Sequence, residues 1–149
     1  SHVWAARACL PAMLQRGSGY FLNTASAAGL LNQIGDAAYS TTKHAAVGFA
    51  ESLAITHGDD GIGVSVVCPQ AVATRMIGAS EGGQGGTAGV DGVLTAEQVA
   101  DEVIKGLDAE QFLILPHKEV IEYRRRKTED YDRWLGGMRK LRRQFGNPA

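Results

Sequence analysis

Residues 38–46 place a phenol and an ammonium group four positions apart, at Tyr39 and Lys43. If this segment is helical, the two side chains lie on one face, one turn apart. A free tyrosine ionises at about pH 10 and transfers protons poorly at neutral pH, but a neighbouring cation favours the phenolate. The pair could therefore act as a general acid/base if other residues support it, whereas alone it fits an exposed helix start better.

Two loops are expected to lie beside this pair. Ser26 stands thirteen residues before Tyr39 and follows a predicted strand at 20–24. The segment 69–74 follows a second predicted strand at 62–68. In an open α/β sheet, ligands bind at the carboxyl ends of the strands. We therefore expect Ser26, the start of the Tyr39 helix and residues 69–74 to converge on one crevice.

Helical and strand patterns alternate along the chain. They predict helices at 2–16, 37–57, 95–108 and 117–144, and strands at 20–24, 62–68 and 112–115. Asp36 is placed to cap the second helix, and Pro11 is expected to bend the last turn of the first helix or to end it early. This order predicts an α/β layer structure with parallel strands. Three strands are few for such a sheet, so we expect it to be part of a larger one.

Two connections between these elements contain several glycines. Residues 25–36 are small and turn-rich and are expected to form a loop. Residues 75–94, between the second strand and the third helix, contain seven glycines. Because long loops in compact domains are often lids, we interpret 75–94 as a substrate loop.

The composition is that of a soluble globular protein, with 149 residues, 44% apolar residues and a formal net charge of −1. That charge favours neither a nucleic acid nor a membrane as partner. The basic run 124–127 is interrupted by acidic residues and is interpreted as a solvated helix face.

Cys9 and Cys68 stand in apolar contexts and are expected to be buried, reduced thiols of a cytoplasmic protein. The cysteines show no metal-ligand spacing and the histidines are scattered, so no metal site is predicted.

Three motifs together resemble the carboxyl half of the classical short-chain dehydrogenases/reductases. They are Asn23-Thr-Ala-Ser26-Ala-Ala-Gly29, Tyr39-x-x-x-Lys43 and Pro69-x-x-Val72-x-Thr74. The resemblance is close over residues 1–75 and rests on element order beyond them. It implies a Rossmann-type doubly wound parallel sheet, of which only the carboxyl-terminal three strands and their helices are present. Residues 1–149 would then be the carboxyl-terminal portion of a single domain, and the family's glycine-rich dinucleotide turn would lie in an amino-terminal half upstream.

The resemblance implies that hydride passes between NAD or NADP and a secondary alcohol or ketone. Tyr39 would be the general acid/base and would contact both substrate and cofactor. Lys43 would favour the phenolate and bind the nicotinamide ribose, and Ser26 would hold the substrate oxygen against Tyr39. The segment beside the nicotinamide would contribute Pro69, Val72 and Thr74. Gln70 departs from the glycine that is common at its position in the family.

Partners other than a small alcohol or carbonyl substrate are also implied by the resemblance. The family often forms homo-oligomers, and the alanine-rich helix 37–57 is the expected subunit contact. A competing hypothesis is a truncated, non-catalytic relative that binds a partner subunit or acts as a structural fragment. Substrate identity and the choice between NAD and NADP are left open. Because open sheet edges favour association, these 149 residues alone are expected to be poorly soluble or tightly associated.

Overall fold

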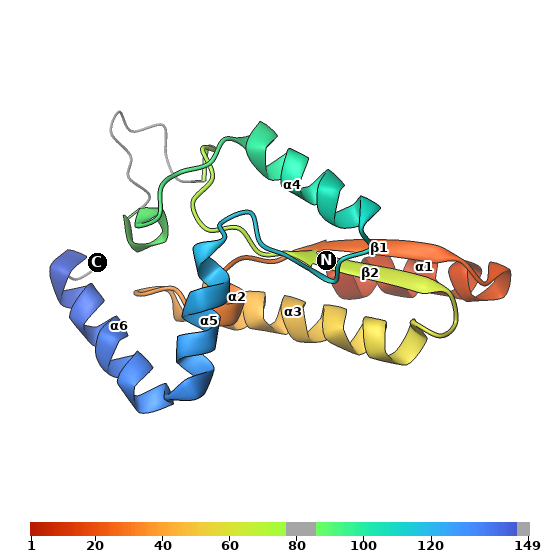
Figure 1. The fold of residues 1–149 in the computed structure, drawn as a ribbon. Coiled ribbons are helices and arrows are strands. Elements are labelled where there is room, and N and C mark those ends of the chain that lie inside the picture. Colours follow the sequence, from red (N-terminus) through yellow and green to blue (C-terminus); the bar gives the residue numbers. More distant parts are fainter. Residues whose placement is uncertain (77–85, 146–149) are drawn as a thin grey trace.

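The computed structural model describes residues 1–76 and 86–145. Residues 77–85 of the expected substrate loop therefore lie outside the described residues. The elements are α1 (His2–Arg16), β1 (Gly19–Thr24), α2 (Ala28–Leu31), α3 (Ala37–His57), β2 (Ile62–Val67), the 3-10 helix η1 (Gly86–Gly89), α4 (Ala96–Asp108), β3 (Leu113–Ile114), α5 (Glu119–Glu129) and α6 (Tyr131–Phe145), as Figure 1 shows.

The three strands form one parallel sheet in the order β1-β2-β3. The β1–β2 register runs from Gly19 opposite Ile62 to Thr24 opposite Val67, so both strands end at the same level. Strand β2 is central, and all of its residues except Gly63 are buried. Helices α1 and α3 cover one face of the sheet and α4 covers the other (Figure 1). The predicted α/β layer structure with parallel strands is confirmed.

Helix α3 begins at Asp36, as the sequence predicts. The Asp36 side chain accepts a hydrogen bond from the backbone N–H of Tyr39 at 2.8 Å, which satisfies one of the free donors of the first turn. Gly29 lets α2 lie directly on α3, because a Cβ at that position would stand 2.5 Å from the carbonyl oxygen of Lys43. The cap and this close contact fix the turn of α3 that carries Tyr39 and Lys43.

Helix α1 has the predicted bounds and continues past Pro11 to Arg16, so the proline does not end it early. Two other local predictions are wrong. The predicted loop 25–36 contains the short buried helix α2, which is held against α3. Cys9 is exposed on α1, whereas Cys68 is buried as expected, and both cysteines are free.

The predicted single helix at 117–144 is two helices. Asp130 between α5 and α6 has an extended backbone, with φ −152° and ψ 95°. Its Oδ1 accepts a hydrogen bond from the backbone N–H of Arg133 at 2.9 Å, which is the behaviour of a residue that caps a new helix. The chain therefore changes direction at Asp130, and α6 runs back to contact η1 (Figure 1).

Candidate active site

A cavity of about 1610 Å³ lies at the carboxyl ends of β1 and β2. It is bounded by the loops after these strands, the start of α3, the 3-10 helix η1, and parts of α5 and α6. The residues that the sequence singled out all line it, namely Ser26, Tyr39, Lys43, Pro69, Val72 and Thr74. The predicted convergence on one crevice is confirmed, and the roles of these residues stay predictions.

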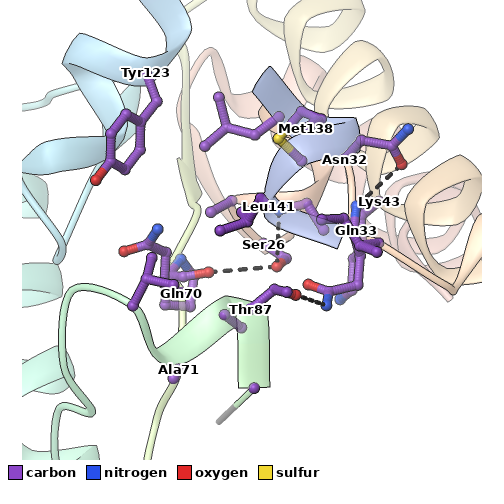
Figure 2. Close-up of a pocket in the computed structure, with 18 of the residues that line it drawn as sticks. Ser26, Asn32, Gln33, Lys43, Gln70, Ala71, Thr87, Tyr123, Met138 and Leu141 are labelled. Atoms are coloured by element: carbon purple, nitrogen blue, oxygen red, sulfur yellow. Dashed lines mark hydrogen bonds between the residues drawn. The ribbon is translucent and has the colours of Figure 1, made fainter. Parts of the chain in front are cut away.

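Ser26 joins the loops that follow the two strands. Its side chain is buried, and its Oγ donates to the carbonyl oxygen of Pro69 at 3.3 Å and accepts from the N–H of Ala28 at 3.1 Å (Figure 2). The N–H of Ala27 also donates to the Pro69 carbonyl, at 2.8 Å. The hydroxyl is thus held in a fixed place by backbone groups, at the floor of the cavity.

Lys43 lies between the Tyr39 ring and the end of β1. Its Nζ is 5.5 Å from the centre of the Tyr39 ring and donates to the carbonyl oxygen of Thr24 at 3.4 Å. An ammonium group has three donors, so this hydrogen bond leaves others for a ligand. The sequence spacing therefore produces a phenol and a cation on one face of α3, both partly buried and both open to the cavity.

The segment after β2 is held by a histidine that the sequence analysis passed over. His117 is only 3% exposed, and its Nδ1 accepts a hydrogen bond from the N–H of Gln70 at 3.1 Å. Burial lowers the pKa of His117, while the carboxylates of Glu119 and Asp91 act in the opposite direction. The neutral ring with its proton on Nε2 fits the observed acceptor at Nδ1. The feature of the sequence that could have identified His117 is its position two residues after the predicted third strand, 112–115.

Further hydrogen bonds fix the outer walls. The Gln33 side chain donates to Thr87 Oγ1 at 2.9 Å, which ties η1 to the loop between α2 and α3 (Figure 2). The Tyr123 hydroxyl donates to Asp91 Oδ1 at 2.8 Å, which ties α5 to the loop before α4. Burial and the Asp91 carboxylate raise the pKa of Tyr123 to about 12, so this phenol stays protonated at neutral pH.

The basic run 124–127 forms part of α5, and two of its residues, Arg125 and Arg126, line the cavity. Arg125 and Arg126 pair with Glu122 at 2.8 Å, as expected for a solvated helix face. Lys127 instead donates to the carbonyl oxygen of Leu30 at 2.6 Å.

Within residues 1–76 and 86–145, no group of three or more His, Cys, Asp or Glu side chains could hold a metal ion. The helices of these residues include none long and apolar enough to cross a membrane.

Comparisons with known proteins agree with this arrangement. A model of the short chain dehydrogenase family matches residues 1–84. The chain is 35% identical over 120 residues to 1-deoxy-11-beta-hydroxypentalenate dehydrogenase from Streptomyces exfoliatus, covering 80% of this chain and 43% of that protein. It is 32% identical over 108 residues to D-beta-hydroxybutyrate dehydrogenase from Rhizobium meliloti, covering 72% of this chain and 40% of that protein. The chain thus spans less than half the length of these two relatives.

A solved structure resembles the fold as well. The short chain dehydrogenase/reductase from Burkholderia phymatum in complex with NAD is 27% identical, with a TM-score of 0.71. The match covers 97% of this chain and 56% of that chain. The chain therefore corresponds to a little over half of that protein's chain.

Proposed function

Because the chain belongs to the short chain dehydrogenase family, we propose that its full-length protein is an NAD(P)-dependent oxidoreductase acting on a secondary alcohol or ketone. The observation that carries the proposal is the convergence of Ser26, Tyr39 and Lys43 on one cavity at the carboxyl ends of β1 and β2. These three groups supply a hydroxyl, a phenol and a cation, which is the set that proton transfer at a carbonyl oxygen needs.

In this proposal Tyr39 handles the proton. The Tyr39 phenol gives its proton to the substrate oxygen during ketone reduction and takes one from the alcohol during oxidation. The ammonium of Lys43, 5.5 Å from the Tyr39 ring centre, stabilises negative charge on the phenolate. To bind the substrate oxygen, the Ser26 hydroxyl turns its single proton from the Pro69 carbonyl, 3.3 Å away, to the substrate, and it thereby orients that oxygen toward Tyr39.

The residues present fit a nicotinamide cofactor. When bound, NAD(P) supplies or accepts the hydride. Lys43 has donors left for the hydroxyl groups of a ribose. Gln70 Oε1 is buried, lines the cavity and has no hydrogen-bond partner among the described residues, so it is an acceptor that a bound amide or hydroxyl would satisfy. The side of the cavity that would meet the nicotinamide is formed by Pro69, Val72 and Thr74.

Two wider features belong to the same proposal. Residues 1–149 would form the carboxyl-terminal portion of a single Rossmann-fold domain, with 75–94 as its substrate loop. The full-length protein would be a homo-oligomer, because the outer face of α3 exposes Ala45 and Gly48 and so allows close approach of a second copy.

Replacing Tyr39 tests the proposal. In the full-length protein, Tyr39→Phe should lower kcat/KM by about 10²- to 10⁴-fold, because the variant lacks the proton that the mechanism transfers. Turnover would be followed as the absorbance of NADH or NADPH with secondary alcohols and ketones as substrates. Tyr131→Phe is the matched control, since it removes a phenol hydroxyl that is 56% exposed and outside the cavity lining. Wild-type turnover in Tyr39→Phe would contradict the assignment.

A further inference from the structure

We propose that α6 is the specificity wall of this site and that it selects a substrate with a bulky apolar group beside the reacting carbon. The inference rests on the proposed function and names the substrate class of the same cavity. It comes from the apolar face of α6, which the break at Asp130 turns back toward Ser26.

One face of α6 enters the cavity. Trp134, Met138 and Leu141 follow one another at intervals of four and three residues, which puts them on the same side of a helix. All three are partly buried and line the cavity. Leu135, which is one residue on from Trp134, is 49% exposed and does not line it. The apolar residues that line the cavity therefore stand on one side of α6, and the helix as a whole is not apolar.

The apolar face of α6 shares the cavity with the proposed catalytic groups. The side chains of Met138 and Leu141 lie in the same cavity as that of Ser26 (Figure 2). Leu31 and Ile34, from the segment between Ser26 and Tyr39, line the cavity too, as does Val90 after η1. A substrate whose oxygen reaches Ser26 would thus have its neighbouring substituent among aliphatic and aromatic side chains. Burying apolar surface there favours a large apolar group over a small one.

Several polar side chains of the surrounding walls already have partners. Gln33 is bonded to Thr87, and the Tyr123 hydroxyl is bonded to Asp91. Arg125 at the rim pairs with Glu122. These groups gain less from a polar substituent than unpaired groups would, because part of their hydrogen-bonding capacity is already used within the protein. The wall therefore adds little stabilisation for a polar substituent, whereas it favours an apolar one.

The alternative is a substrate that carries a carboxylate. Arg133 and Lys140 on α6 line the cavity and would attract such a group. Both side chains are exposed, whereas Trp134, Met138 and Leu141 on the same helix are partly buried. The cations thus belong to the solvent side of the rim, and the apolar residues meet the substrate.

Three secondary alcohols distinguish these substrates in the full-length protein. The probes are tetralol (bulky and apolar), isopropanol (small) and β-hydroxybutyrate (carboxylate-bearing), each with NAD⁺ and with NADP⁺. We expect kcat/KM for tetralol to exceed that for the other two by about 100-fold or more, since each methylene in an apolar pocket contributes about 10-fold or more.

Substitutions in α6 test whether its apolar face causes the preference for tetralol. Leu141→Ala and, as a second variant, Met138→Ala should each lower kcat/KM for tetralol by about 10-fold, through KM more than kcat, and change isopropanol turnover by less than about 2-fold. Leu135→Ala is the matched control, because it makes the same truncation on the outer face of the same helix, and it should leave both substrates unchanged. Circular dichroism spectra would confirm that all three variants are folded.

The outcomes separate this inference from the proposed function. Tyr39-dependent turnover that prefers isopropanol or β-hydroxybutyrate would overturn the inference and leave the proposed function standing. So would Leu141→Ala and Met138→Ala variants that behave like Leu135→Ala. For the carboxylate alternative, Arg133→Gln would lower the turnover of β-hydroxybutyrate. Turnover of none of the three alcohols would overturn both.

Discussion

The chemically important side chains of the cavity are held by backbone groups at the ends of the strands. Ser26 Oγ donates to the carbonyl oxygen of Pro69, and Lys43 Nζ donates to that of Thr24. His117 accepts from the N–H of Gln70. Since these backbone groups belong to the last residue of β1 and to the loop after β2, the sheet itself sets the positions of the side chains. Preorganisation of this kind is what a reaction centre requires.

Cys68 gives a test of burial at the residue scale. It is fully buried at the end of β2, and burial raises the pKa of its thiol to about 11. Only the thiolate is alkylated, so iodoacetamide at pH 8 should modify Cys68 very slowly in the folded full-length protein and quickly in denaturant. Exposed Cys9 is the internal control and should react in both conditions. The measurement is peptide mass spectrometry against time, and equal rates for the two cysteines in the folded protein would contradict the buried position.

At the scale of single elements, the ends of helices determine where the site forms. Asp36 begins α3, so that Tyr39 and Lys43 fall in its first two turns and face the cavity. Asp130 ends the run of α5 and begins α6 in a new direction. Thr95 and Gln98 form the reciprocal capping box that begins α4, the helix predicted at 95–108. A capping residue is a local feature of the sequence, but it sets where a whole helix begins and therefore which side chains reach the cavity.

Removing the cap of α3 should weaken both the helix and the reaction. We expect Asp36→Ala to lower the free energy of unfolding of the full-length protein by about 1 kcal/mol, because the N–H of Tyr39 loses its acceptor. The same variant should also lower kcat, since the first turn of α3 carries the proposed acid/base. Urea unfolding and steady-state kinetics measure the two effects. Asp59→Ala, in the exposed turn after α3, is the matched control, and an equal loss in both variants would contradict the role of the cap.

At the scale of the whole molecule, the fold is a parallel α/β sheet with an unpaired edge. The Rossmann-type fold and the relation to the classical short-chain dehydrogenases/reductases, both expected from three motifs, are confirmed by the family match and the structural neighbour. Within the described residues β1 pairs with β2 on one side only. A strand edge of this kind offers free N–H and C=O groups to another chain.

The open edge predicts association of the isolated 149-residue polypeptide. In sedimentation velocity it should sediment faster than a 15.8 kDa monomer, because copies pair along β1. Leu22→Lys, at a β1 position that is 41% exposed, should shift it toward monomer, since charge on an edge strand opposes pairing. Leu14→Lys makes the same change on α1, where the side chain is 36% exposed, and should have no such effect. A well-behaved monomer at micromolar concentration would contradict the prediction.

The sequence was sufficient for several features that depend on neighbouring residues. The bounds of α3 and the core of β2 agree with prediction because helical periodicity, a capping aspartate and a β-branched run are local patterns. The convergence of Ser26, Tyr39 and Lys43 was also predictable, because the carboxyl ends of parallel strands share one edge of the sheet.

Tertiary contacts settled what no local pattern specifies. Gln70 and His117 are forty-seven positions apart, and their hydrogen bond forms only because β3 lies beside β2. From the sequence, the apolar side of α6 could equally belong to a helix on the outside of the fold. In the structure, the chain breaks at Asp130 and this side of α6 lines the cavity. The sequence thus identified the pair at Tyr39 and Lys43, and the packing of distant segments determined the shape of the cavity in which that pair lies.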